Sequence, residues 1–98
     1  MIRRACENDI EKIYELGSSY NPNFLKTYDI VEYLKNDKYI VLVEDDLDIK
    51  AFLICYKNIE SFELEMIVVG EKYRGKGIGS NLLEHFLQNY RQLQGLKP

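Results

Sequence analysis

Tyr73-Arg74-Gly75-Lys76-Gly77-Ile78-Gly79-Ser80 is a segment in which three glycines alternate with Arg74, Lys76 and Ile78. An apolar run, 66–69, precedes it, and an amphipathic run, 78–93, follows it. This order predicts a strand, a glycine-rich turn and a helix. The first turn of a helix leaves backbone N–H groups without intrahelical partners, and its dipole favours negative charge. The segment therefore predicts a binding site for a phosphate or pyrophosphate group.

The 98 residues are enough for one small globular domain, so we expect a single domain over 1–98. The net charge of −3 argues against a general nucleic-acid-binding protein, which needs a strongly basic face. We find no metal-ligand spacing, no signal peptide and no apolar run that could span a membrane. Cys6 and Cys55 lie in apolar contexts. We expect them to be buried free thiols in a reducing compartment, and the protein to be cytoplasmic.

The rest of the chain predicts short alternating elements. We expect a strand at 2–5, a helix capped by Asn8 or Asp9 and ended by Gly17-Ser18-Ser19, a loop at 20–23, a helix from Thr27 or Asp29 to Asn36, and strands at 39–43, 49–56 and 62–69. Short turns join the last three strands, which predicts antiparallel pairing. The order β-α-α-β-β-β-α indicates an α/β fold in the mixed α+β sense, with a mainly antiparallel sheet.

Two nucleotide-binding motifs fail at the glycine-rich segment. Gly70 to Lys76 satisfies Gly-x-x-x-x-Gly-Lys, but the next residue must be Ser or Thr to hold magnesium, and it is Gly77. The dinucleotide pattern Gly-x-Gly-x-x-Gly fails because Gly79 stands one position early. These mismatches exclude both a magnesium-dependent nucleotide-binding loop and a dinucleotide-binding turn at this segment.

Arg74-Gly75-Lys76-Gly77-Ile78-Gly79 instead matches the pattern Gln/Arg-x-x-Gly-x-Gly/Ala. In this strand, turn and helix context the chain resembles the GNAT superfamily of N-acetyltransferases, and the preceding β-α-α-β-β order agrees with that family. The resemblance implies acetyl-CoA (coenzyme A) as the cofactor. The pyrophosphate would be held by the backbone of residues Gly75, Lys76, Gly77, Ile78, Gly79 and Ser80, with added charge from Arg74 and Lys76. The pantetheine arm would pair with the strand residues Ile67, Val68 and Val69.

The resemblance also implies a carboxylate base in the strand before the turn, where Glu63 and Glu65 stand. Strand alternation predicts that both glutamates share a face with Ile67 and Val69, and that Phe62, Leu64, Met66 and Val68 share the other face. A carboxylate there would remove a proton from the acceptor amine if burial raised its pKa. The alternative, that both glutamates only face solvent, stays open. The loop 20–24 is placed either to shape the acceptor site or to pack in the core.

The family continues beyond the matched helix with further strands and a helix, whereas this sequence ends at Pro98. We therefore expect one wall of the cofactor groove, including the tyrosine that commonly reprotonates the thiolate, to be missing from this chain. The strand 62–69 would then be an edge that pairs with another chain. We expect a homodimer or larger assembly. Two functions remain open: acetyl transfer to a primary amine by direct attack, or an inactive acyl-CoA-binding module completed by a partner chain.

Overall fold

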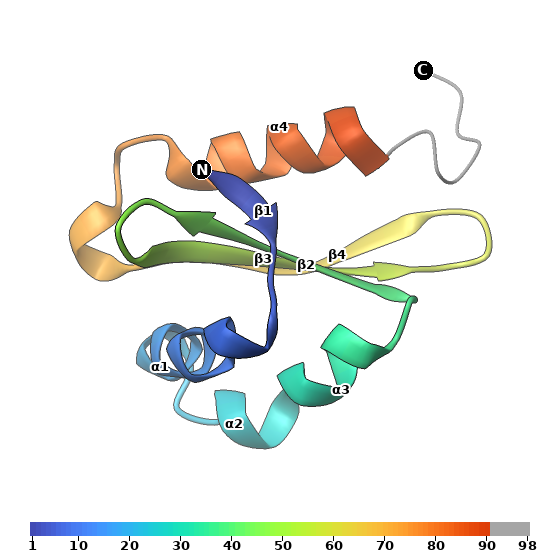
Figure 1. The fold of residues 1–98 in the computed structure, drawn as a ribbon, viewed down its shortest axis with the longest axis horizontal. Coiled ribbons are helices and arrows are strands. Elements are labelled where there is room, and N and C mark those ends of the chain that lie inside the picture. Colours follow the sequence, from blue (N-terminus) through green and yellow to red (C-terminus); the bar gives the residue numbers. More distant parts are fainter. Residues whose placement is uncertain (91–98) are drawn as a thin grey trace.

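The computed structural model describes residues 1–90 and shows one antiparallel sheet between two helical layers (Figure 1). In chain order the elements are β1 (Ile2–Arg4), η1 (Glu7–Asp9), α1 (Ile10–Tyr20), α2 (Phe24–Thr27), α3 (Ile30–Lys35), β2 (Tyr39–Asp45), β3 (Ile49–Lys57), β4 (Phe62–Val69), η2 (Glu71–Tyr73) and α4 (Ile78–Tyr90). The predicted α+β class and element order are confirmed. The expected end of the last helix at Leu93 lies outside the described residues.

The four strands form one antiparallel sheet in the order β1-β2-β3-β4. A tight turn at 46–48 joins β2 to β3, and Leu47 in this turn is fully exposed with a φ of 68°. Residues 58–61 join β3 to β4. In Figure 1 the β3–β4 turn and the glycine-rich turn lie at opposite ends of the sheet. The two ends of β4 therefore have different surroundings.

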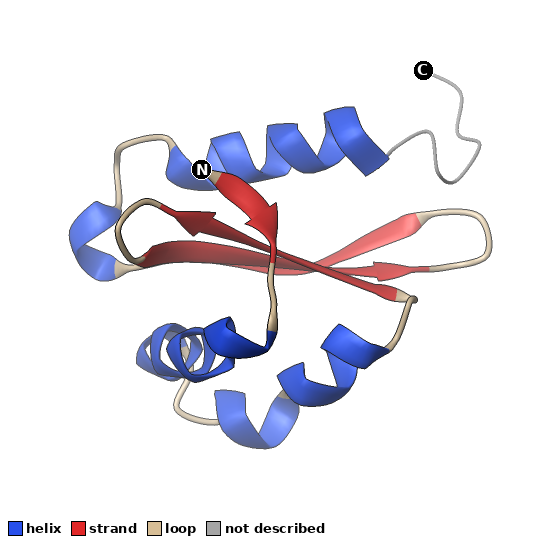
Figure 2. Cartoon of the chain, in the orientation of Figure 1, coloured by secondary structure: helices blue, strands red, loops and turns tan. Residues whose placement is uncertain are grey.

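The two faces of the sheet are covered by different helices, as the blue ribbons on either side of the red strands show (Figure 2). Helices α1, α2 and α3 cover one face. Its buried core consists of Ile13, Phe24, Ile30, Val41, Val43, Ile49, Phe52, Ile54 and Val68. Helix α4 covers the other face, where its Leu82 and Phe86 share a buried core with the sheet residues Ile40, Leu42, Ala51, Leu53 and Cys55. Burying each large side chain stabilises the fold by about 1.5–3 kcal/mol, so both layers are needed.

The predicted end of the first helix at Gly17-Ser18-Ser19 is wrong, because α1 continues to Tyr20. Gly17 is buried within the helix, and a Cβ atom placed there would lie 2.6 Å from ring carbons of Phe24. The glycine is thus required by the close approach of an aromatic ring and not by a helix stop. Phe24 is fully buried, which settles its role in the loop 20–24 as packing.

Asp9 precedes α1 as predicted, but its carboxylate does not cap that helix. It accepts a hydrogen bond from the N–H of Cys6 at 2.8 Å and two from the guanidinium of Arg3 at 2.8 and 2.9 Å. Arg3 also contacts Asp45 at the end of β2. The Arg3 guanidinium lowers the pKa of the buried Asp9 carboxyl. This network fixes the first strand to the first helix.

The two cysteines differ in their surroundings. Cys55 is buried as expected, but Cys6 is exposed, so the prediction for Cys6 is wrong. Its neighbour Ala5 packs against the core, whereas the Cys6 side chain is exposed. Both thiols are free.

Candidate functional site

The glycine-rich turn joins η2 to α4 through a backbone that glycine adopts most readily. Gly75 has a φ of 79° and Gly77 a φ of 80°, both in the left-handed region, where side chains cause strain. A Cβ atom added at either position would meet no protein atom within 4 Å. Both glycines are therefore required by the backbone conformation, and the space beside them is open to a ligand.

Six consecutive backbone N–H groups at this turn have no hydrogen-bond acceptor among the described residues. Within residues 1–90, the N–H groups of 75–80 make no hydrogen bond, whereas the N–H of Asn81 donates to the carbonyl of Gly77 at 3.0 Å. Ile78 begins the 13-residue helix α4, whose dipole adds partial positive charge at this end. Several parallel donors at a helix start are the arrangement that binds phosphate oxygens. The predicted phosphate-binding turn thus has the geometry that such a group needs.

Basic side chains accompany these N–H groups. Nε of Arg74 donates to the carbonyl of Val69 at 3.1 Å, so this guanidinium ties the turn to the last residue of β4. Lys76 is exposed in the middle of the turn. The ammonium of Lys72 lies 5.6 Å from the ring centre of Tyr73, which keeps its charge near the turn. These basic side chains gather at one turn of a chain whose net charge is −3.

The start of α4 lies directly against the end of β4. A Cβ atom added at Gly79 would lie 3.4 Å from Cγ2 of Val69 and 3.6 Å from Cγ2 of Ile67, at ordinary contact distance. Val68, between these two residues, is buried against the opposite helical layer. The structure therefore brings the predicted cofactor-binding residues of β4, 67–69, next to those of the turn, 74–80.

Within the described residues, β4 is an edge of the sheet, because β3 is its neighbour on one side only. Backbone groups that point away from β3 along 67–69 are available to a ligand or to another strand. A peptide-like group could pair with them as a strand would. The edge prediction is thus consistent with the sheet order in residues 1–90.

A β-bulge interrupts β4 at Glu65. Met66 lies opposite Ile54 and Leu64 lies opposite Cys55, so Glu65 has no partner residue on β3. Such an extra residue shifts the alternation of side chains by one position. Phe62 accordingly packs with α4, in the same cluster as Ile67, while Met66 packs on the opposite face.

The predicted faces of β4 are therefore wrong for its first half. The prediction placed Glu63 with Ile67 and Val69, and Phe62 with Met66. Instead Phe62 shares the α4 face with Ile67 and Val69, and Glu63 lies opposite Tyr56 on the face covered by α1, α2 and α3. Regular alternation cannot anticipate a bulge, because nothing in the apolar pattern of β4 marks the extra residue.

Glu63 and Glu65 are both exposed. Residues 1–90 therefore do not provide the burial that would make either carboxylate a stronger base. The Glu65 carboxylate nevertheless contributes to the raised pKa of two nearby side chains, Tyr33 and Cys55. Burial raises the pKa of Tyr33 to about 12, with smaller contributions from Tyr39 and the Glu65 carboxylate. Burial likewise raises the pKa of Cys55 to about 12, and Glu65 adds to the effect.

Three tyrosines that the sequence analysis did not single out lie beside these glutamates. Tyr33 of α3 stacks on Tyr39 of β2 with ring centres 3.9 Å apart, and Tyr39 lies 5.1 Å from the ring of Tyr56 on β3. Tyr56 lies opposite Glu63. A row of aromatic rings thus leads across the sheet to the first half of β4. No local motif marks this row, since its members come from three elements.

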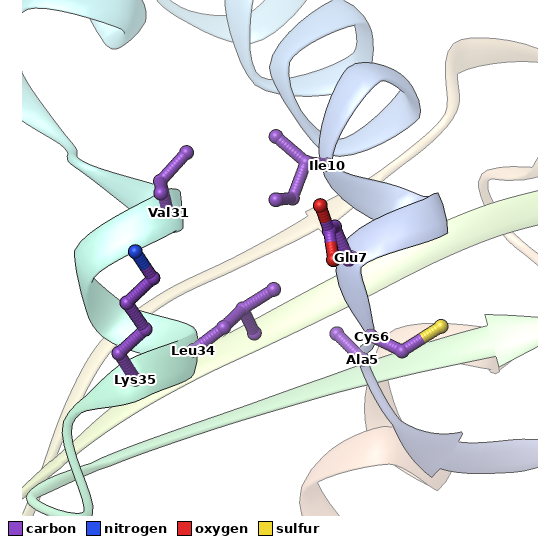
Figure 3. Close-up of a pocket in the computed structure, with 7 residues that line it drawn as sticks. All are labelled: Ala5, Cys6, Glu7, Ile10, Val31, Leu34 and Lys35. Carbon is purple, nitrogen blue, oxygen red and sulfur yellow. The ribbon is translucent and has the colours of Figure 1, made fainter.

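A separate groove of about 540 Å³ lies between the first residues of the chain and α3 (Figure 3). In the figure, Ile10 and Leu34 project toward each other across it, and the Cys6 thiol points away. Its lining contains none of the predicted site residues. The groove is thus distinct from the turn and from β4.

Residues 1–90 show no sign of a metal site or of a membrane-spanning helix. No group of three or more potential metal-binding side chains converges at one place. No helix has the length and apolar character that crossing a membrane requires.

Three solved structures have a fold similar to that of this chain. An acetyltransferase from Vibrio fischeri has 19% sequence identity and a TM-score of 0.73, over 96% of this chain and 88% of that chain. A ribosomal-protein-alanine N-acetyltransferase from Brucella melitensis biovar Abortus has 23% identity and a TM-score of 0.77, over 99% of this chain and 74% of that chain. An aminoglycoside 6'-N-acetyltransferase complexed with coenzyme A has 20% identity and a TM-score of 0.78, over 94% of this chain and 56% of that chain.

Comparison with curated protein sequences gives no significant match. The family model described as the acetyltransferase (GNAT) family matches residues 7–98, which is nearly the whole sequence. The matched region contains the glycine-rich turn, β4 and the helices that cover the sheet. This chain therefore belongs to the acetyltransferase (GNAT) family.

Proposed function

We propose that the protein binds acetyl-CoA and transfers the acetyl group to a primary amine by direct attack. The observation that carries this proposal is the run of N–H groups at 75–80 that have no acceptor within residues 1–90, next to 67–69 on the strand that is the edge of the described sheet. Family membership and a relative complexed with coenzyme A support the same cofactor.

The turn and the strand have separate tasks toward the cofactor. The N–H groups of 75–80, with Lys76 and Arg74, would hold the pyrophosphate. The backbone of 67–69 would hold the amide-bearing arm, and an N–H on that edge would polarise the thioester carbonyl. When bound, acetyl-CoA supplies an acetyl group activated as a thioester.

The acceptor amine must lose a proton because only the neutral amine is nucleophilic. We assign proton removal to Glu65, directly or through water, with Glu63 as the second candidate. Glu65 is favoured because the bulge places it between the cofactor-binding half of β4 and the tyrosine row. Its exposure in residues 1–90 means that a bound cofactor, acceptor or partner chain would have to supply the burial.

We also propose that the chain forms a homodimer through β4 and α4. An apolar groove of about 360 Å³ runs between them, lined by Phe62, Leu64, Leu83 and Phe86 among others. Leu64 and Leu87 at this groove are nearly half exposed. Sedimentation that finds only monomer at micromolar concentration would contradict self-association. Two free thiols favour a reducing compartment, so we place the protein in the cytoplasm.

Calorimetry with acetyl-CoA tests the binding part, and we expect saturable binding at micromolar to millimolar ligand. A thiol-release assay with a panel of amines then tests catalysis, because steady release of CoA that depends on the acceptor requires an enzyme. Binding without acceptor-dependent release would favour an acyl-CoA-binding module instead. Absence of binding at millimolar acetyl-CoA would refute both functions.

A further inference from the structure

The tyrosine row, Tyr33, Tyr39 and Tyr56, ends at Glu63 on the first half of β4. We propose that Tyr39, Tyr56 and Glu63 bind a second positive charge on the acceptor, so that the preferred acceptor is a short diamine or polyamine. This inference rests on the proposed acetyl transfer and names the class of its acceptor.

The strand register places the three groups side by side. Tyr39 lies directly opposite Tyr56, and Tyr56 lies directly opposite Glu63, so all three project from the same face of neighbouring strands. Tyr33 stacks on Tyr39 at an interplanar angle of 8°, and this contact holds the Tyr39 ring in place. All three rings are partly exposed. The result is a fixed aromatic surface with a carboxylate at its end.

The charges around this surface favour a cation. The amide of Asn58 donates to Oε1 of Glu63 at 2.9 Å, which orients the carboxylate. Lys57 is the nearest basic residue on the same strand as Tyr56, but it lies opposite Phe62, which faces α4. An ammonium group is attracted both by the carboxylate and by tyrosine rings. Burial raises the pKa of Tyr33 to about 12, so its hydroxyl stays neutral and the negative charge comes from the glutamates.

The position of this surface fits an acceptor site. The glycine-rich turn comes after β4 and η2, at the end of the sheet opposite to the β3–β4 turn (Figure 1). The tyrosine row adjoins the first half of β4, because Tyr56 pairs with Glu63. Glu65 stands between the glycine-rich turn and the tyrosine row, at the bulge. An acceptor whose far end rests on the row therefore presents its near end to Glu65.

A second charge gives the acceptor an anchor that the reacting nitrogen cannot supply. The reacting nitrogen must be deprotonated to attack, so its own charge cannot anchor the substrate at the moment of reaction. A second ammonium group that stays protonated can remain on Glu63 and the rings throughout. The carboxylates at 63 and 65 would thus divide the work between holding and deprotonating.

The test uses the protein without cofactor and three probes that share a four-carbon chain: 1,4-diaminobutane, 1-aminobutane and 1-butanol. Binding is measured by calorimetry at low ionic strength, without cofactor. We expect the diamine to bind about tenfold more tightly than the monoamine, and the alcohol not to bind. Glu63→Gln and Tyr56→Leu should each remove most of the preference, whereas Tyr56→Phe, which keeps the ring, should retain it.

Glu60→Gln and Glu11→Gln are matched controls for the loss of a carboxylate, because both residues are exposed but lie outside the row. Equal affinity for diamine and monoamine, or an equal loss in the control variants, would overturn the proposal. The same variants are titrated with acetyl-CoA and should bind it unchanged. Diamine binding without any acetyl-CoA binding would refute the proposed transferase but not the cation site. Acetyl-CoA binding without diamine preference would refute this inference alone.

Discussion

The two halves of β4 show how differently a short strand can be built. Residues 67–69 pair regularly with β3, contact the start of α4 and lead into a turn whose form is set by two glycines. Residues 62–64 precede the bulge at Glu65, present their side chains to the face opposite to the predicted one, and adjoin tyrosines from three other elements. The first region depends on local sequence, and the second on tertiary contacts. We propose that the first binds the cofactor and the second binds the acceptor.

The largest expected effect is a loss of acetyl-CoA binding that leaves the proposed acceptor half of β4 unaffected. Gly77→Val forces a β-branched residue to a φ of 80° and reorients the N–H groups. Backbone strain of about 1–3 kcal/mol and the loss of charge-assisted hydrogen bonds of about 1.5–3 kcal/mol each should weaken acetyl-CoA binding roughly a thousandfold. Calorimetry measures this loss, and diamine binding should be unchanged.

Leu47→Val controls for strain alone, because Leu47 has a φ of 68°, is fully exposed and is not one of the predicted cofactor-binding residues. It should lower the free energy of unfolding but leave acetyl-CoA affinity intact. If Gly77→Val and Leu47→Val weaken acetyl-CoA binding equally, the glycine-rich turn affects binding only through overall stability.

The next largest effect is expected at Glu65, which lies between the two halves of β4. Glu65→Gln keeps the size of the side chain but removes the base, so the rate of acetyl transfer should fall about a hundredfold. The dissociation constant for acetyl-CoA should stay within about twofold. Stopped-flow CoA release and calorimetry measure the two quantities. An unchanged rate would move the role of base to another group, with Glu63→Gln as the first comparison.

A smaller effect tests the bulge itself. Deleting Glu65 removes the residue that has no partner on β3, so Leu64 should keep its place opposite Cys55 and Phe62 should stay packed on Phe86. The free energy of unfolding should change by less than about 2 kcal/mol in denaturant titrations. If alternation were regular, the deletion would turn Phe62 and Leu64 to the opposite face. The loss would then be the 3–5 kcal/mol typical of an emptied aromatic site.

Local patterns were enough to predict the strands, the glycine-rich turn and the order of the elements. Val68 and its neighbours alternate cleanly, and Gly75 and Gly77 stand where the left-handed backbone needs them. Predictions failed where a residue serves a distant partner. Gly17 makes room for Phe24, and Asp9 binds Arg3.

The candidate site follows the same division. Its cofactor half could be inferred from a six-residue motif, and the structure brings those residues together. Its acceptor half could not, because the bulge at Glu65 leaves no mark in the apolar pattern. The tyrosine row is assembled from α3, β2 and β3 and becomes visible only once the strand register is known.

The smallest effect concerns a thiol at the boundary between the halves. Cys55 lies opposite Leu64 beside the bulge, and burial raises its pKa to about 12 from an ordinary value near 9. In the unfolded chain the thiol loses its proton at a lower pH, so between pH 9 and pH 12 the folded state binds more protons. The stability that the protonated thiol contributes is therefore fully present below pH 9 and is lost as the pH rises toward 12. At pH 9.5 the loss should be about 1 kcal/mol relative to pH 8.

Urea titrations at pH 8 and pH 9.5 measure this change in the wild type, in Cys55→Ala and in Cys6→Ser. Removing the buried thiol should abolish the cysteine-dependent part of the pH effect, at a constant cost in packing. Removing the exposed thiol of Cys6 should leave the effect in place. The same comparison shows whether the bulged half of β4 is closed in solution, since a thiol that reaches water would titrate near its ordinary pKa. An equal pH effect in wild type and Cys55→Ala would therefore mean that the strand opens at the bulge, and that the acceptor half is less fixed than the cofactor half.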